Sequence, residues 1–181
     1  LNSMRSIAAP HRDAKVNGFT LVEVLVAALI LGVLMLVAVP GFSDLISNNR
    51  MVSEVYALRA TLSHARSEAL ALRPPVVVCP TNDGLACADS VDWSIGYMAF
   101  PETDVDNVAD PDEVMQWEDG QNSVAMLFDN ANKKVRFGGQ GNTLDFEGTF
   151  TFCDERGQEH ARALILNPVG SLRGALDKEA I

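Results

Sequence analysis

The stretch Gly18-Phe19-Thr20-Leu21-Val22-Glu23-Val24-Leu25-Val26 decides the organisation of this chain. A short basic segment precedes it, whose charged residues are Arg5, Arg12, Asp13 and Lys15. After it the sequence stays apolar to Val39, and Glu23 is the only charged residue in that run. A carboxylate at the centre of a bilayer costs about 2.5–3.5 kcal/mol. We therefore expect Glu23 to have a dedicated partner.

Two simpler interpretations explain part of this pattern. A secretory signal peptide has an apolar core of about 7–15 residues followed by a small-residue cleavage site. The apolar run here is longer, and no such site follows it. An ordinary single-span anchor needs about 20 apolar residues, and residues 19–40 meet that requirement. The position of Glu23 relative to Gly18 favours a processed anchor over a plain one.

The N-terminal layout resembles the precursors of type IV pilins and pseudopilins. In that family a prepilin peptidase cleaves after the glycine and methylates the new N-terminal residue. The resemblance implies cleavage after Gly18, methylation of Phe19, and pairing of Glu23 with the N-terminal amine of a neighbouring subunit. It also implies four regions: a leader peptide over 1–18, a transmembrane and assembly helix over 19–40, the amphipathic second half of that helix over 41–73, and an exported β-rich globular domain over 74–181.

The charge distribution predicts how the chain is oriented. The net charge is −10, and residues 74–181 carry 19 acids against 7 bases. Because the basic residues precede the apolar run, the positive-inside rule places the N-terminus in the cytoplasm. With the family resemblance, this predicts a single pass through the bacterial inner membrane, a periplasmic C-terminal domain, and later a pilus or pseudopilus. An acidic exported domain also disfavours nucleic acid as a partner, since phosphates are bound by Lys and Arg.

Apolar periodicity predicts one long helix from about Thr20 to Leu72. Its first half is apolar on all sides, and its second half repeats apolar residues at steps of three and four, as in a helix packed on a core. These residues are Val52, Val55, Leu58, Leu62, Ala65, Ala69 and Leu72. Pro40-Gly41 interrupts the run, because proline inside a helix kinks or breaks it. The interruption is either a simple kink at the membrane surface or a segment that unwinds in a fibre.

The remainder has the pattern of short strands separated by turn residues. The predicted strands are Val76–Cys79, Trp93–Phe100, Val114–Trp117, Val124–Phe128, Val135–Phe137, Leu144–Phe146, Thr149–Cys153, Ala161–Leu166 and Leu172-Arg173. The predicted fold class is α+β, with a long N-terminal α-helix, membrane-spanning in its first half, packed on a C-terminal antiparallel β-sandwich.

The C-terminal domain resembles the FimT/FimU/GspH branch of minor pilins. The motifs that carry this resemblance are Val78-Cys79-Pro80, Trp93-Ser94-Ile95-Gly96-Tyr97, Phe152-Cys153-Asp154-Glu155-Arg156-Gly157 and Asn167-Pro168-Val169-Gly170. It implies a minor pilin that primes or caps a type IV pilus. The alternatives are a GspH-like pseudopilin of a type II secretion system and a FimT-like DNA-binding pilin of natural transformation. The implied partners are other major and minor pilins, the prepilin peptidase and the inner-membrane assembly machinery.

Nothing in the sequence indicates an enzyme or a cofactor. The three histidines are scattered along the chain without nucleophile or metal spacing, and no glycine-rich phosphate loop is present. The three cysteines lie in the part expected outside the cytoplasm, where disulfides form. Cys79 and Cys87 enclose seven residues and are the favoured pair. Cys79 with Cys153 is the rival pairing.

An acidic segment over residues 102–113 imitates a calcium loop. The carboxylates that would bind the ion are Glu102, Asp104, Asp106, Asp110 and Glu113. Position 1 is Glu rather than Asp and no helix precedes the segment, so we favour a solvated loop between strands and predict no metal.

The C-terminal tail bears on DNA binding. DNA-binding relatives carry Gly-Arg-x-Arg near the C-terminus, whereas this chain has Gly170-Ser171-Leu172-Arg173. Only Arg173 therefore carries over as a possible DNA contact. The other basic cluster, Lys133, Lys134 and Arg136, alternates along a predicted strand and is interpreted as a solvated surface.

Overall fold

The computed structural model describes residues 18–102, 108–109, 113–121 and 123–175. The leader residues Arg5, Arg12, Asp13 and Lys15 lie outside them. The chain divides into two compact units, one ending at Ser43 and one beginning at Asp44. The one α-helix among the described residues, α1 (Leu21–Leu72), starts in the first unit and ends in the second. The prediction of a single helix from Thr20 to Leu72 is confirmed to within one residue.

Thr20 starts the helix. Its Oγ1 accepts a hydrogen bond of 3.3 Å from the backbone N–H of Glu23, and its carbonyl accepts one of 3.2 Å from the N–H of Val24. The first N–H groups of a helix have no partner within it, and a threonine at the N-cap satisfies one of them. Thr20 with Glu23 three residues later is the sequence pattern of a capping box.

The beginning of α1 is apolar on every side. Between Leu21 and Leu36 the large apolar side chains are 52 % to 79 % exposed. No single helix among the described residues is long and apolar enough to cross a membrane, whereas the bent pair Leu21–Leu36 and Gly41–Leu72 could do so by length and composition alone. Pro40 lies inside α1, so the predicted interruption does not end the helix.

The second half of α1 supplies an apolar stripe to the core of the second unit. Its fully buried apolar residues are Met51, Leu58, Leu62, Ala65 and Ala69. Four of these five were predicted from the periodicity. The stripe is shifted at its two ends, because Met51 is buried where Val52 was expected and Leu72 is 57 % exposed.

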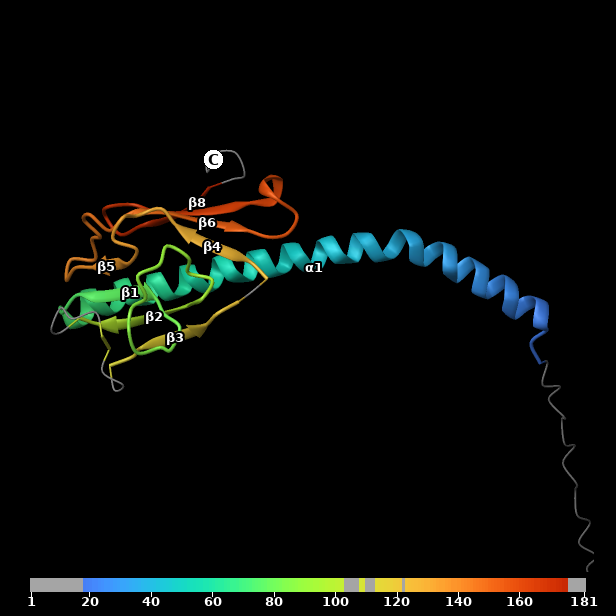
Figure 1. Cartoon of the computed structure of the whole chain (residues 1–181), viewed down its shortest axis with the longest axis horizontal. Coiled ribbons are helices and arrows are strands. Elements are labelled where there is room, and N and C mark those ends of the chain that lie inside the picture. The colour runs from blue at the N-terminus through green and yellow to red at the C-terminus, as the bar shows by residue number, and fades with distance from the viewer. Residues whose placement is uncertain (1–17, 103–107, 110–112, 122, 176–181) are drawn as a thin grey trace, which may run out of the picture. The chain divides into compact units, whose positions relative to one another are not determined.

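Two four-stranded antiparallel sheets follow the helix (Figure 1). The first has the order β3-β2-β1-β5 and consists of β1 (Val76–Pro80), β2 (Gly96–Pro101), β3 (Gln116–Asp119) and β5 (Val135–Phe137). The second has the order β4-β6-β7-β8 and consists of β4 (Ala125–Phe128), β6 (Gly148–Cys153), β7 (Arg162–Leu166) and β8 (Leu172–Ala175). A short 3-10 helix, η1 (Gln158–His160), connects β6 to β7. The predicted α+β class is confirmed.

Both sheets and α1 share one apolar core. Aromatic side chains dominate its centre, where Phe128 stacks on Phe150 at a centroid distance of 4.2 Å and Trp93 meets Phe150 edge-on at 4.8 Å. Such pairs are worth about 0.5–1.5 kcal/mol each beyond the area that they bury. Trp93, Phe128 and Phe150 are all buried, so these aromatic pairs stabilise the centre of the core.

The outer face of the first sheet carries a second, smaller apolar cluster. Successive side chains of β1 point alternately into the main core and into this smaller cluster. Val76 and Val78 belong to the main core, and Val77 and Cys79 belong to the smaller cluster. The residues after β1 cover this outer face, because Cys87 packs against the smaller cluster. β1 is consequently buried on both faces, which is why its sequence is continuously apolar rather than alternating.

One predicted strand is wrong. Leu144–Phe146 forms a turn, in which the backbone N–H of Phe146 donates to the carbonyl of Thr143 and Asp145 adopts a positive φ of 69°. An aspartate tolerates this left-handed conformation better than most residues. The conformation is incompatible with a strand. The apolar residues on either side of Asp145 gave a misleading alternation, and Leu144 is 63 % exposed.

Candidate processing and assembly site

The residues expected at the cleavage site precede α1 without being part of it. Gly18, Phe19 and Thr20 are all exposed and have no regular secondary structure. Phe19 is 83 % exposed, and no heavy atom outside the neighbouring residues lies within 4 Å of the position of a Cβ on Gly18. The peptide bond between Gly18 and Phe19 is therefore sterically accessible to a peptidase.

Glu23 lies in the first turn of α1 and is the only acid there. A negative charge near a helix N-terminus is stabilising by typically 0.3–1 kcal/mol. Part of the role of Glu23 is therefore to stabilise α1. Its carboxylate makes no hydrogen bond or ion pair with another described residue, since only its backbone N–H is bonded, to Thr20. The carboxylate oxygens thus remain available to a partner.

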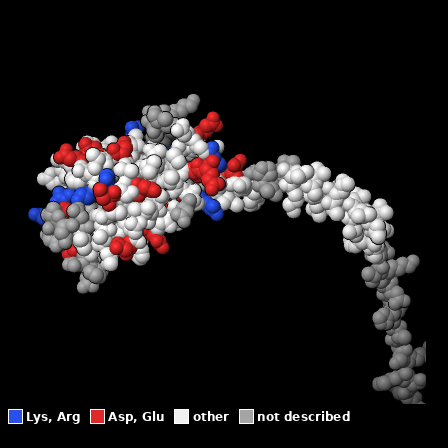
Figure 2. Space-filling view, in the orientation of Figure 1, with Lys and Arg blue, Asp and Glu red and all other residues white. Residues whose placement is uncertain are grey.

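The apolar surface of α1 surrounds Glu23. The visible face of this part of the helix carries almost no charged residue, in contrast with the second unit, where acids and bases are interspersed (Figure 2). Exposed apolar surface of this extent marks a membrane or protein contact. A single exposed carboxylate on such a surface is suited to select one register among otherwise equivalent apolar contacts.

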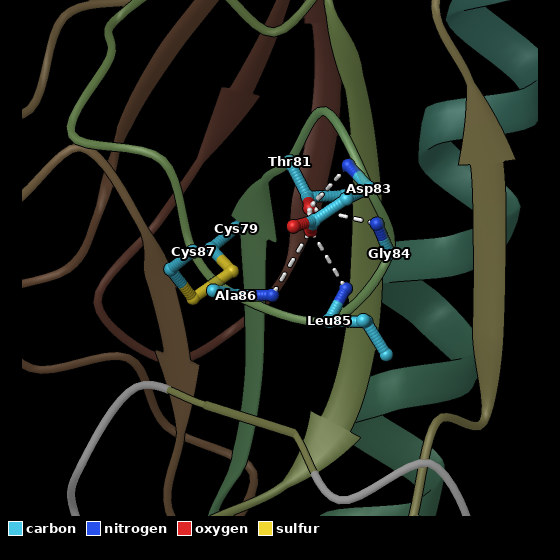
Figure 3. Close-up of a disulfide and its surroundings, with 7 residues drawn as sticks. All are labelled: Cys79, Thr81, Asp83, Gly84, Leu85, Ala86 and Cys87. Carbon is cyan, nitrogen blue, oxygen red and sulfur yellow. Dashed lines mark hydrogen bonds between the residues drawn. A yellow bond between two sulfur atoms is a disulfide. The ribbon is translucent and has the colours of Figure 1, made fainter.

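The disulfide predicted between Cys79 and Cys87 is present, with a Cα–Cα distance of 5.5 Å (Figure 3). Cys79 belongs to β1 and is fully buried, whereas Cys87 lies in the loop that follows. Cys153, the rival partner, is a free and partly exposed thiol on β6, in the other sheet. The disulfide therefore ties the loop after β1 to the outer face of the first sheet.

A side-chain network holds the enclosed loop in shape. The carboxylate of Asp83 accepts hydrogen bonds from the N–H of Leu85 at 2.9 Å and of Ala86 at 3.2 Å. The hydroxyl of Thr81 donates to the same carboxylate at 3.1 Å and accepts from the N–H of Gly84 at 3.0 Å (Figure 3). These hydrogen bonds, first that from Leu85, lower the pKa of Asp83. The turn at Asp83-Gly84 is therefore held by side-chain hydrogen bonds as well as by the disulfide.

The acidic segment that imitates a calcium loop is only partly described. Asp104, Asp106 and Asp110 lie outside the described residues. Glu102 is buried and its carboxylate accepts a hydrogen bond from the Nε of Arg136 in an ion pair. The described residues contain no group of three or more His, Cys, Asp or Glu side chains that could hold a metal. The solvated loop thus stays the prediction, and one residue of the alternative calcium loop, Glu102, is already paired to an arginine.

The basic residues considered for DNA binding take part in separate contacts. Lys133 forms an ion pair with Asp89 at 2.8 Å, and Arg136 is paired with Glu102. Arg173 is exposed on the edge strand β8, opposite Ile165 of β7. Two of the three bases in the 133–136 cluster are thus neutralised by acids.

Two structural arginines were not anticipated. Arg66 of α1 donates to the carbonyl oxygens of Gly141 and Val169, both at 2.9 Å. Arg156 donates to the Asp154 carboxylate, with Nη2 at 2.6 Å from Oδ2, and also contacts the helix carbonyl of Asp44 at 3.4 Å. The Arg156 guanidinium holds the pKa of Asp154 below its usual range. The only sequence signal for Arg66 was a charged residue next to the apolar stripe.

Comparison with known families gives two matches that together cover most of the chain. A family model described as type II transport protein GspH matches residues 54–170. A model of the prokaryotic N-terminal methylation motif matches residues 13–39, which include Gly18, Phe19 and Glu23. The search of curated proteins gives no match.

Two solved structures are similar in fold. Both are crystal structures of the type IV minor pilin FimU of Pseudomonas aeruginosa strain PAO1, in two space groups, and each is 22 % identical to this chain. The first has a TM-score of 0.59 and an alignment that covers 74 % of this chain and 93 % of that one. The second has a TM-score of 0.56, with coverages of 71 % and 95 %. At this identity the likeness establishes the fold alone.

Proposed function

The chain belongs to the family of the type II transport protein GspH and carries a prokaryotic N-terminal methylation motif, and from this premise we propose that it is a minor pilin of a type IV pilus. The precursor is cleaved after Gly18 by a prepilin peptidase, and Phe19 is methylated. The subunit then joins the fibre through α1 and primes or caps its assembly. The family is structural rather than enzymatic, so the mechanism is association.

One observation carries this proposal. The exposed Gly18-Phe19 bond lies directly before a helix whose first part, up to Leu36, is apolar apart from Glu23. A peptidase needs the exposed bond, and a membrane or a fibre interior accounts for the apolar surface. The carboxylate makes no hydrogen bond or ion pair with another described residue, so it is available to the N-terminal amine of a neighbouring subunit. We infer that this pairing selects register, because a buried ion pair contributes more reliably to specificity than to stability.

From the same arrangement we infer the route of the protein. Before cleavage the apolar part of α1 anchors the precursor in the bacterial inner membrane, with the globular domain in the periplasm. After cleavage the helix leaves the lipid and packs against other major and minor pilins, assisted by the inner-membrane assembly machinery. Apolar surface that is covered by lipid in one state is covered by protein in the other.

A pseudopilin of a type II secretion system is the second candidate, favoured by the description of the family model that matches residues 54–170. A DNA-binding pilin is a weaker third candidate, since Arg173 is the one tail arginine that matches that pattern.

Deletion of the gene separates these functions. We expect a deletion strain to have few or no surface pili by electron microscopy, with restoration by the wild-type gene, and mature protein from sheared fibres to begin at methylated Phe19 by mass spectrometry. Normal piliation together with a loss of protein secretion would assign the chain to a secretion pseudopilus. Normal piliation with a loss of DNA uptake would assign it to transformation.

A further inference from the structure

A pocket of about 260 Å³ lies between the C-terminal part of α1 and the turn that joins β7 to β8. The helix contributes Arg59, Ser63 and Arg66 to its walls, and the turn contributes Gly170 and Ser171. No acid is among the described residues that line this arginine pocket, although the chain has a net charge of −10. Positive charge is therefore concentrated at one place on an acidic protein.

Arg66 is fixed in the wall of the pocket before any ligand binds. Its Nε and Nη2 donate to the carbonyl oxygens of Gly141 and Val169, both at 2.9 Å. A Cβ on Gly141 would lie 3.1 Å from the same Nε, and a Cβ on Gly170 would lie 2.9 Å from it. The two glycines thus leave room for the guanidinium, whose Nη1 has no acceptor among the described residues. A side chain that is already held in place loses little further freedom when an anion binds to it.

Three more donors of the pocket have no acceptor within the described part of the chain. The guanidinium of Arg59 and the hydroxyl of Ser63 form no hydrogen bond or ion pair there, and both residues are exposed. The hydroxyl of Ser171 accepts a hydrogen bond of 3.1 Å from the Nδ2 of Asn167 but donates to no described group. Arg59, Ser63 and Arg66 follow one another at steps of four and three, so they lie on one side of α1. The pocket offers hydrogen-bond donors and positive charge, and an anion satisfies both.

A single carboxylate suits this pocket better than a nucleic acid does. The planar guanidinium of an arginine donates two parallel hydrogen bonds to a carboxylate. Duplex DNA carries about one charge per 1.7 Å of its axis, so an acidic chain repels it at long range. The carboxylate of a protein side chain brings one charge only, and its binding is decided by the contacts inside the pocket. The pocket also lies on α1, the element through which we propose that the subunit joins the fibre.

We propose that the arginine pocket binds the carboxylate of an aspartate or glutamate side chain of a neighbouring subunit. Arg59 and Arg66 supply the positive charge, and the hydroxyls of Ser63 and Ser171 donate further hydrogen bonds. That the carboxylate comes from another subunit rests on the proposed function, whereas the affinity of the pocket for a carboxylate does not.

An NMR titration of the ¹⁵N-labelled full chain in detergent micelles tests this affinity. The probe is N-acetyl-glutamate methylamide, and the control compound is N-acetyl-glutamine methylamide, which has the same shape without the charge. The signals to follow are the backbone N–H groups of Gly170 and Ser171, with that of Gly157, outside the pocket, as the reference. We expect the glutamate compound to shift the first two signals saturably and the glutamine compound to bind about tenfold more weakly or not at all. Equal shifts with both compounds, or no shift at Gly170 and Ser171, would overturn the proposal.

Two variants and a second anion make the titration specific. Arg59→Gln removes a guanidinium that bonds to no described residue, so the fold is retained, and we expect it to weaken binding of the glutamate compound about three- to tenfold. Arg50→Gln, an exposed position of the same helix outside the pocket, should bind as the wild type does. Equal binding by all three proteins would contradict a role for Arg59. Tighter binding of dimethyl phosphate than of the glutamate compound would overturn the assignment to a carboxylate.

Charge reversal tests the neighbouring subunit as the source of the carboxylate. We expect Arg59→Glu to reach the membrane in normal amounts and to be reduced at least about threefold in sheared fibres, with Arg50→Glu incorporated as the wild type is. Wild-type incorporation of Arg59→Glu, or an equal loss for Arg50→Glu, would overturn this source. Absence of the wild-type protein from fibres would contradict the proposed function itself, and the neighbouring subunit with it, while the titration still decides whether the pocket binds a carboxylate.

Discussion

Arg66 on α1 donates a hydrogen bond of 2.9 Å from its Nε to the carbonyl oxygen of Gly141, which lies 75 residues further along the chain. Its Nη2 donates to the carbonyl oxygen of Val169 at the same distance. One side chain therefore connects the helix to two turns. The first spans residues 138–141, and the second lies between β7 and β8. Both turns contain a glycine with positive φ, Gly141 at 71° and Gly170 at 75°.

Replacement of Arg66 by alanine should lower the free energy of unfolding by about 1–3 kcal/mol. Hydrogen bonds to a charged group are worth about 1.5–3 kcal/mol, and partial exposure of this side chain reduces that value. Urea unfolding followed by tryptophan fluorescence measures the change. Arg59→Ala is the matched control, because Arg59 is an exposed arginine on the same helix. Equal stability of the two variants would contradict a connecting role for Arg66.

Gly170 should not tolerate a side chain. A Cβ at this position would lie 2.0 Å from the carbonyl oxygen of Gly141, and the backbone φ is 75°. Gly157 has a similar φ of 89° but open space around its Cβ position. We expect Gly157→Ala to cost about 1–3 kcal/mol from its backbone conformation alone, because φ 89° with ψ −173° is adopted almost only by glycine, and Gly170→Ala to cost clearly more. Thermal unfolding of the two variants compares the costs, and the difference between them reports the clash with Gly141.

The features of the fold that depend on local sequence patterns were predicted correctly from the sequence. The helix, all eight strands to within about three residues, and the Cys79–Cys87 pair follow from periodicity, β-branched runs and the spacing of the two cysteines around Asp83-Gly84. The Leu144–Phe146 error has the same origin, because periodicity does not reveal that Asp145 adopts a left-handed conformation. The contacts of Arg66 were unpredictable for another reason. Its acceptors are backbone carbonyls 75 and 103 residues away, and a carbonyl leaves no trace in the sequence.

Removal of the disulfide should destabilise the protein by about 2–3 kcal/mol, the chain-entropy value for so short a loop. The variant is Cys87→Ser, which leaves Cys79 buried as a free thiol in the smaller cluster. Cys153→Ser is the control and should change stability little, because Cys153 is unpaired and partly exposed. Both are compared by urea unfolding without reductant. A larger loss for Cys153→Ser than for Cys87→Ser would show that Cys153 is the cysteine that stabilises the domain.

The ion pair between Asp154 and Arg156 should give a stability that disappears in acid. The pKa of Asp154 is lowered by Arg156 in the folded protein, relative to about 3.9 in an unfolded chain. The contribution is therefore present above about pH 4 and is lost as the pH falls through the lowered value. We expect Asp154→Asn to be less stable than the wild type at pH 7, and the difference to shrink at pH 3. Urea unfolding at both pH values measures this.

Glu54→Gln provides the opposite case in the same experiment. The pKa of Glu54 is raised by burial and by Glu118, so its ionised form opposes folding. The variant should then be more stable than the wild type at pH 7, and the gain should vanish as the pH falls below the ordinary range of a glutamate. A difference that does not change with pH for either variant would mean that the charge of that residue has no part in stability.

Glu23→Ala should separate membrane insertion from assembly. Insertion depends on the apolar run, which the substitution lengthens, so the precursor should still enter the membrane and be cleaved after Gly18. Assembly should fail, because the N-terminal amine of the neighbouring subunit loses the carboxylate that fixes its register. The measurement is the amount of the variant in sheared fibres relative to the membrane fraction. Asp44→Ala, which removes an exposed acid from the same helix, should leave that ratio unchanged. Wild-type incorporation of Glu23→Ala would contradict the pairing and leave the favourable charge of Glu23 near the N-terminus of α1 as its only role.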